Sequence, residues 1–155
     1  TTQMAINFAD VASKPIADVE RPPLPPVGTY RWRISKLPEM TTSQNGEWDI
    51  VTVNVQAVEA LDDVEVSDYP GDIANIRQSV RFMFNKQDEA EFEKSLFRFR
   101  TFLEKHVKCA EPDHTIGQAM NASVNGEFLG AIAWKQDKED PEIFFANIAR
   151  TAPVE

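Results

Sequence analysis

The residue types that most often carry catalysis or hold metal ions come close together only once in this sequence. His106, Cys109 and His114 are separated by three and five residues, a spacing that matches no established zinc motif, and no fourth ligand is evident. We interpret them as a histidine on a helix face, a small buried thiol and a histidine in a loop. No serine lies in a Gly-x-Ser-x-Gly elbow either. We therefore expect no enzymatic activity, no metal site and no cofactor.

Acidic and glycine-based ligand motifs are equally weak. Residues 57–75 hold six carboxylates and no Lys or Arg, but their spacing lacks the turn glycine and the closing glutamate of an EF-hand loop. We interpret this segment as a solvated acidic loop. The six glycines are scattered singly, and none begins a Gly-x-x-x-x-Gly-Lys phosphate-binding sequence.

Basic and aromatic residues on strand-like segments are the strongest remaining candidates. Sequence-independent binding of single-stranded nucleic acid needs cations that follow the phosphates and flat rings on which bases stack. Both types occur at the faces and ends of the expected strands. The candidate nucleic-acid-binding residues are Arg31, Arg33, Trp48, Arg81, Lys86, Trp134 and Lys135. The alternating aromatics Tyr30, Trp32, Phe82 and Phe84 are instead expected in the core.

The overall composition limits the class of protein. The 155 residues are 42% hydrophobic, which suits one domain with a real core, and the net charge of −9 argues against a uniformly basic nucleic-acid binder. Charge is nevertheless uneven, because residues 76–108 carry eight bases against five acids. With one cysteine, no apolar run long enough to span a membrane and no secretory signal, we expect an intracellular protein that does not bind membranes.

Hydrophobic periodicity predicts five strands and one long helix. Apolar residues alternate in the first three strands, at Gly28–Ser35, Ile50–Ala57 and Val80–Asn85, and the Asn45-Gly46 turn should make a hairpin of the first two. Asp88, with Glu91 three residues later, is expected to form a capping box at the start of a helix whose apolar face repeats every three or four residues as far as Leu103. The last two strands are expected at Phe128–Lys135 and Ile143–Arg150.

Residues 115–125 fit two local structures. The spacing of Ile116, Met120 and Val124 indicates a short helix ended by Asn125-Gly126, which we favour, whereas the alternation of Met120, Ala122 and Val124 is typical of a hairpin turning at the same dipeptide.

The order of the elements predicts the fold class. Three strands, a helix and two strands are typical of an all-β barrel with an inserted helix, namely a five-stranded OB-fold-like barrel with its major helix between strands 3 and 4. We expect this domain at residues 27–155. Residues 1–26 end in a proline-rich run and should form an N-terminal arm, whose apolar pair Ile6 and Phe8 could dock or stay loosely ordered.

Several short runs also resemble one family. They are Ile6-Asn7-Phe8-Ala9-Asp10-Val11, Pro26-Val27-Gly28-Thr29-Tyr30, Phe102-Leu103-Glu104, Phe128-Leu129-Gly130 and Phe145-Ala146-Asn147-Ile148. The chain is similar to the phage-encoded OB-fold single-stranded DNA-binding proteins of phage replication and recombination modules. The resemblance implies a viral, non-catalytic DNA-binding protein that coats single-stranded DNA during phage DNA replication, recombination or repair in the host cytoplasm.

Two functional hypotheses follow. The first is sequence-tolerant binding of single-stranded DNA, with replication or recombination proteins as further partners and a homo-oligomer left open. The second is a phage structural or protein-interaction module that uses the barrel to hold a protein partner. The negative net charge of the chain and the proline-rich arm would suit such a module.

Overall fold

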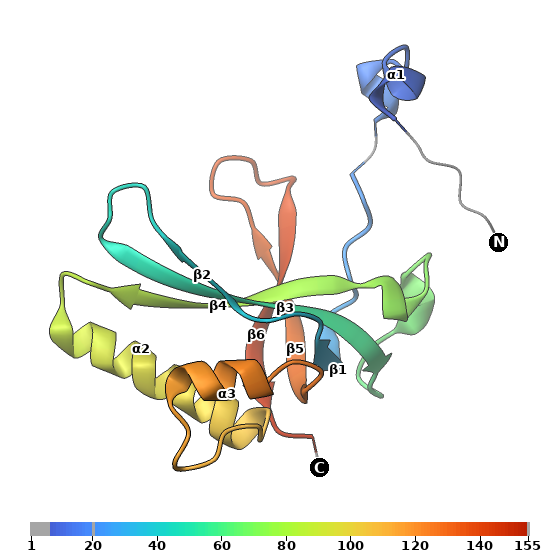
Figure 1. Ribbon diagram of the computed structural model, residues 1–155. Helices are drawn as coiled ribbons and strands as arrows, with labels where there is room; N and C mark the ends of the chain where they lie inside the picture. Colours follow the sequence, from blue (N-terminus) through green and yellow to red (C-terminus); the bar gives the residue numbers. More distant parts are fainter. Residues whose placement is uncertain (1–6, 20, 155) are drawn as a thin grey trace.

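The computed structural model describes residues 7–19 and 21–154 (Figure 1). The strands are β1 (Gly28–Ile34), β2 (Glu39–Thr42), β3 (Trp48–Ala60), β4 (Arg77–Asn85), β5 (Glu127–Gln136) and β6 (Phe144–Ala152). The helices are α1 (Phe8–Val11), α2 (Glu89–Thr101) and α3 (Ile116–Ala122). Single turns of 3-10 helix are η1 (Ile16–Asp18), η2 (Val66–Asp68) and η3 (Ile73–Asn75), and η4 (Phe102–His106) is a π-helical turn that continues α2.

All strand pairs are antiparallel and join into one six-stranded sheet. Its ladder runs β2-β3-β1-β5-β6, and β4 pairs with the other edge of β3. The long strand β3 therefore has three partners. One of its edges pairs with β4, and the other pairs with β2 in its first part and with β1 in its last part. The outer strands β4 and β6 contact each other across the curved sheet. The structure is thus mostly β, with one long helix between β4 and β5.

The five strands expected from the sequence form, and β2 is an addition. Its four residues are all exposed, so no apolar alternation marks it. The expected turn at Asn45-Gly46 joins β2 to β3, not β1 to β3, which corrects the predicted hairpin. Gly46 there has a φ of +74°, a conformation that suits glycine. The strand count is six and not five, with β2 lying inside the connection between β1 and β3.

Alternating side chains of β1 and β3 fill the core as predicted. Tyr30, Trp32 and Ile34 of β1 are fully buried, and Val53 and Val55 of β3 pack beside them. Gly130 of β5 makes room for Trp32, whose indole Nε1 donates to the Gly130 carbonyl at 3.0 Å. A Cβ on Gly130 would lie 2.9 Å from the Trp32 ring. The sheet interior is therefore packed tightly enough to hold the strands in one register.

Helix α2 covers one end of this core. The Asp88 side chain accepts from the Glu91 backbone N–H at 3.2 Å, which confirms the predicted cap. Phe99 is buried with Phe102 and Leu103 of η4, and Phe82 of β4 lies against both phenylalanine rings. The amphipathic face thus packs where its periodicity indicated.

Residues 116–122 form helix α3, so the favoured interpretation of this ambiguous segment is confirmed. Thr115 and Gln118 form a capping box at its start. Asn125, with a φ of +69°, takes the left-handed conformation after the helix and leads into β5. Helices α2 and α3 lie on the same side of the sheet in Figure 1.

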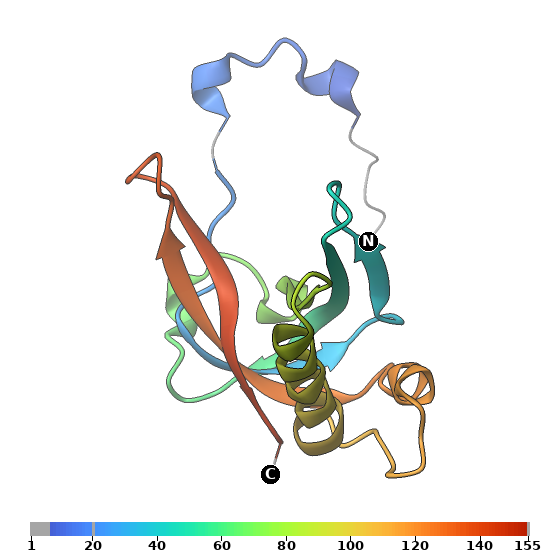
Figure 2. The same cartoon turned by 90° about the vertical axis from the view of Figure 1, so that its left-hand side faces the viewer.

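The segment before β1 runs away from the sheet (Figures 1 and 2). Phe8 of α1 and Ile16 of η1 are both strongly exposed, while Ile6, the other half of the predicted apolar pair, lies outside the described residues. At the root of this arm, the buried Tyr30 hydroxyl donates to the Pro26 carbonyl at 2.6 Å. Within the described residues, no helix has the length and apolar character needed to cross a membrane.

Candidate nucleic-acid interface

A groove of about 920 Å³ lies where β4 and β6 approach each other. Its cationic lining comes from Lys36 after β1 and from Arg77 and Arg81 of β4, and Phe145 of β6 contributes an aromatic ring. Polar side chains complete it, namely Ser35, Asn54, Gln78, Ser79 and Asn147. None of the described residues that line the groove is acidic. A chain with a net charge of −9 therefore carries a locally basic groove.

Cross-strand register places Arg33 on the same sheet face as the groove cations Arg77 and Arg81. Arg33 of β1 and Arg77 of β4 both lie opposite Gln56 of β3, and directly opposed residues share a face of the sheet. Arg81 lies opposite Thr52, so it shares this face and lies two side-chain positions further along β4 than Arg77. With strands spaced about 4.8 Å apart, Arg33 and Arg77 are about 10 Å from each other, within a Debye length at ordinary ionic strength. Arg33 and Arg77 therefore contribute to one local positive potential, although Arg33 itself does not line the groove. Arg81 lies four residues along β4 from Arg77, about 13 Å away.

Arg31 has a different environment from the other predicted cations. Its Nη1 lies 3.5 Å from Glu59 Oε1, and its Nε lies 3.3 Å from Glu127 Oε1. Its side chain is also mostly covered. Two carboxylates thus already neutralise Arg31, and binding a phosphate would require it to leave them.

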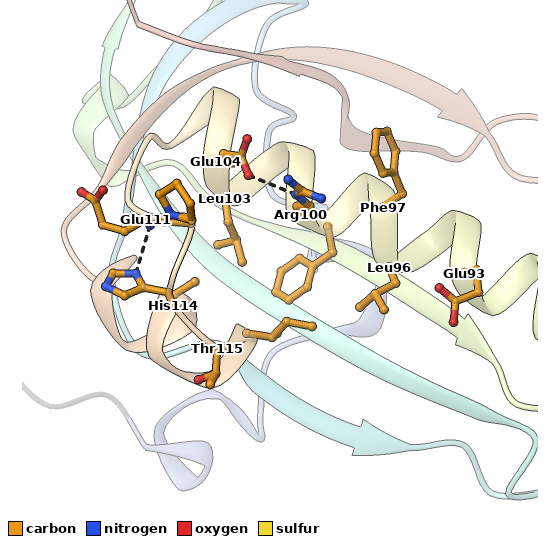
Figure 3. Close-up of a pocket in the computed structure, with 14 residues that line it drawn as sticks. Glu93, Leu96, Phe97, Arg100, Leu103, Glu104, Glu111, His114 and Thr115 are labelled. Atoms are coloured by element: carbon orange, nitrogen blue, oxygen red, sulfur yellow. Dashed lines mark hydrogen bonds and ion pairs between the residues drawn. The ribbon is translucent and has the colours of Figure 1, made fainter.

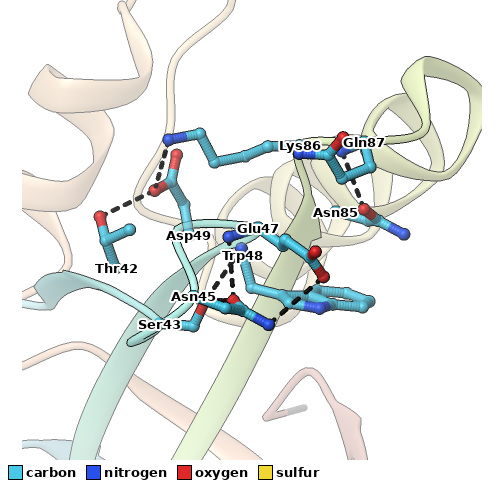
Figure 4. Close-up of polar contacts among 9 residues, drawn as sticks. All are labelled: Thr42, Ser43, Asn45, Glu47, Trp48, Asp49, Asn85, Lys86 and Gln87. Atoms are coloured by element: carbon cyan, nitrogen blue, oxygen red, sulfur yellow. Dashed lines mark hydrogen bonds and ion pairs between the residues drawn. The ribbon is translucent and has the colours of Figure 1, made fainter.

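Lys86 is likewise paired and points away from the groove. Its Nζ lies 3.7 Å from Asp49 Oδ1, the atom that also accepts from the Thr42 hydroxyl (Figure 4). Asp49 and its neighbour Trp48 point to opposite faces of β3, because side chains alternate along a strand. Lys86 and Trp48, both predicted from the sequence, are therefore not brought to the same surface.

Trp48 lies on the same sheet face as Arg81. The two residues line a smaller hollow of about 470 Å³ together with Met83 and Arg98 of α2. The Trp48 backbone N–H donates to Ser43 Oγ at 3.1 Å, which fixes the strand entry beside the β2–β3 turn (Figure 4). Since Arg81 lines both hollows, it connects the Trp48 end of the face to the main groove.

The β5–β6 hairpin places the other two predicted residues. Lys135 lies opposite Phe145, so these two side chains share a face, whereas Trp134 points to the other one. Trp134 is half exposed, and its Nε1 donates to the Pro25 carbonyl of the arm at 2.7 Å. Lys135 therefore adds a cation beside the Phe145 ring, while Trp134 anchors the arm.

Three groove residues were not predicted from the sequence. Lys36 is two residues after the end of β1, Arg77 begins β4, and Phe145 lies in β6. Arg77 continues the outward alternation of Arg81, so a longer third strand in the prediction would have found it. Phe145 carries no such local signal, because only the pairing with β5 and the approach of β4 bring it to the groove.

The histidines and the cysteine are separated into different contacts. His106 Nδ1 lies 2.7 Å from the Thr151 hydroxyl, and burial lowers the pKa of His106. Burial raises the pKa of the Cys109 thiol, whose Sγ lies 3.5 Å from the Leu103 carbonyl oxygen. Within residues 7–19 and 21–154, no three His, Cys, Asp or Glu side chains are grouped to hold a metal ion.

A second concave surface lies between α2 and the segment leading into α3 (Figure 3). It measures about 480 Å³ and has an apolar floor that includes Leu96 and Leu103. The His114 ring, through Nδ1, accepts from the Glu111 N–H at 3.1 Å at one rim, and Arg100 pairs with Glu104 at 3.0 Å at the other. Its rim mixes both charges, unlike the basic groove.

In the acidic segment between β3 and β4, the Asp63 carboxylate contacts a distant part of the chain. Asp63 accepts from the Thr29 N–H at 2.9 Å and from the Thr29 hydroxyl at 2.8 Å, and the backbone bond chiefly lowers the pKa of Asp63. Asp63 thus closes the loop over the start of β1.

No protein-family model matches the chain, and no curated protein is significantly similar to it.

Proposed function

We propose that this protein binds single-stranded DNA with little sequence preference and without catalysis. The observation that carries the proposal is the groove between β4 and β6, where Lys36, Arg77 and Arg81 meet an aromatic ring and the described lining holds no carboxylate. Cations supply sequence-independent affinity for phosphates, and rings accept any base. The groove offers both residue types on one surface.

The proposed fold is an OB-type barrel. Without β2, the strand order is β4-β3-β1-β5-β6, the outer strands β4 and β6 approach each other, and α2 follows the third of these strands along the chain. OB barrels bind extended oligomers on the face of their second and third strands, between the connections L12 and L45. The equivalents here are β3 and β4, the β2–β3 hairpin and the β5–β6 hairpin, and the two hairpins project on the same side of the sheet in Figure 1. The basic groove is lined by β4, one of the two strands of that face, and by β6.

The residues proposed to contact phosphates are a revised set. Arg33, Arg81 and Lys135 remain from the sequence prediction, and Arg77 and Lys36 join them. Lys36 pairs with Glu39 at 2.8 Å, but both side chains are exposed, so the pair costs little to open. Arg31 is left out of the set because two carboxylates already hold it, and Lys86 because it pairs with Asp49 on a different surface from Trp48 and Arg81.

A titration of a fluorescently labelled dT oligonucleotide at two salt concentrations tests the proposal. If Z phosphates are neutralised on a single strand, the slope of log affinity against log salt is about −0.7Z. Contacts from Arg33, Arg77 and Arg81 alone predict a slope near −2. Absent binding, or binding insensitive to salt, would refute the function.

We also propose the biological setting that the sequence resemblance implied. The chain would belong to the phage-encoded single-stranded DNA-binding proteins and would coat DNA in the host cytoplasm during replication, recombination or repair. The five short sequence runs support this proposal. Recovery of single-stranded phage DNA with the protein after crosslinking in infected cells would test it, and recovery of host RNA alone would contradict it.

A second candidate function is a protein-interaction module, favoured by the exposed apolar side chains of the arm. Phe8, Val11, Ile16 and Val19 are all exposed in the described arm. Pull-down of a protein partner that persists after nuclease treatment and survives Arg77→Glu and Arg81→Glu changes would support it. Loss of the partner on nuclease treatment would support DNA binding instead.

A further inference from the structure

Phe145 is placed as a platform for stacking. It is 50% exposed, whereas Tyr30, Trp32, Phe84 and Phe128 of the strands are buried in the core. Its ring lines the basic groove, and Lys135 lies beside it on the neighbouring strand. A base stacked on this ring would have its phosphates within reach of cations on both sides.

In the structure, a cation from the arm already covers this ring. The guanidinium carbon of Arg21 lies 4.9 Å from the centroid of the Phe145 ring, which is cation–π geometry. An exposed contact of this kind shifts an equilibrium by only about two- to fivefold. Stacking of a base on an aromatic ring is worth about five- to 150-fold. A base can therefore displace Arg21 from the ring.

The arm would keep a displaced Arg21 close to the groove. The polyproline segment after Arg21 is stiff, and its root is held by two hydrogen bonds, from the Tyr30 hydroxyl to Pro26 and from Trp134 Nε1 to Pro25. Pro25 is four residues after Arg21, which in polyproline geometry is a span of about 12 Å. Figure 2 shows this segment running up beside the β5–β6 hairpin before the chain turns away.

We propose that Phe145 is a base-stacking residue and that Arg21, carried by the proline-rich end of the N-terminal arm, acts as a clamp that holds the bound strand. A nucleobase of single-stranded DNA takes the ring face, and the displaced guanidinium pairs with a neighbouring phosphate. This inference rests on the proposed function. It gives the N-terminal arm a role in the same site and identifies Phe145 as the principal stacking residue of the groove.

The test compares a labelled dT oligonucleotide with an abasic oligonucleotide of the same length, which keeps the phosphates but has no bases. Phe145→Ala should weaken binding of dT at least about fivefold and leave abasic binding unchanged, and Phe145→Trp should keep dT affinity. Phe144→Ala is the matched control, because Phe144 is an exposed phenylalanine on the other face of the same strand. It should bind both oligonucleotides as wild type does.

The role of Arg21 is tested separately, by the salt dependence of binding. Arg21→Ala should make the salt slope less negative by about 0.7 on both oligonucleotides, and Arg150→Ala, which removes a cation from the other end of β6, should not. Equal losses on dT and abasic strands, or no loss, in Phe145→Ala would overturn the stacking site. An unchanged slope in Arg21→Ala would overturn the clamp. If wild-type protein binds neither oligonucleotide, the proposed function itself fails.

Discussion

Replacing Arg77 and Arg81 together by alanine should change the salt dependence of DNA binding by a calculable amount. Both guanidinium groups line the groove, and no carboxylate of the described residues lies within ion-pair distance of either. Each lost phosphate contact makes the log–log slope less negative by about 0.7, so the double variant should differ from wild type by about 1.4. A fourfold rise in salt should then weaken wild type about sevenfold more than the variant.

The assay is fluorescence anisotropy of a labelled dT oligonucleotide across a salt series. The matched control is Lys94→Ala with Arg100→Ala, which removes two positive charges from α2, where both side chains are mostly exposed. The control removes the same net charge as the groove variant but no proposed phosphate contact. It should therefore keep the wild-type slope. Equal slopes for both double variants would refute the reasoning, since the groove would then contribute no specific contacts.

Three further predictions concern stability, measured by urea unfolding. Gly130→Ala should lower the free energy of unfolding by about 1–3 kcal/mol, because the new Cβ would lie 2.9 Å from the Trp32 ring; an unchanged midpoint would contradict this packing. Burial lowers the pKa of His106, so the folded state favours the neutral ring and stability is lost as pH falls from above 6.5 through the lowered pKa. The midpoint of wild type should therefore fall more between pH 7 and pH 5 than that of His106→Gln, and parallel profiles would exclude the effect. Asp63→Ala should cost about 1 kcal/mol near neutral pH, since it removes both bonds to Thr29. Because these bonds lower the pKa of Asp63, its contribution should be present above pH 4 and fade as pH falls through the lowered pKa, and a cost that persists in acid would contradict it.

Local sequence patterns were sufficient for the elements that build the core. The alternation of Tyr30, Trp32 and Ile34 and the three- and four-residue spacing around Phe99 each describe one buried face, and both faces are buried as predicted. The cap at Asp88 is a contact within one turn, so it too can be identified from neighbouring residues.

The remaining features depend on pairing between distant segments. Strand β2 is exposed on every residue, so its hydrogen bonds to β3 leave no hydrophobic signal. Arg31 meets Glu59 and Glu127 only because β3 and β5 flank β1, with a register shift after Arg31. In the same way, Phe145 becomes a groove residue only through the approach of β6 to β4. Register therefore decides which predicted cations are neutralised and which face the groove.

The location of DNA binding can be measured directly by NMR. Backbone amide shifts of the isotope-labelled full chain would be recorded during addition of a dT oligonucleotide at low salt. We expect the largest changes in residues 77–81 and 145–148, which line the basic groove on β4 and β6. Changes confined to α2 and α3, or no changes at all, would contradict binding of single-stranded DNA in this groove.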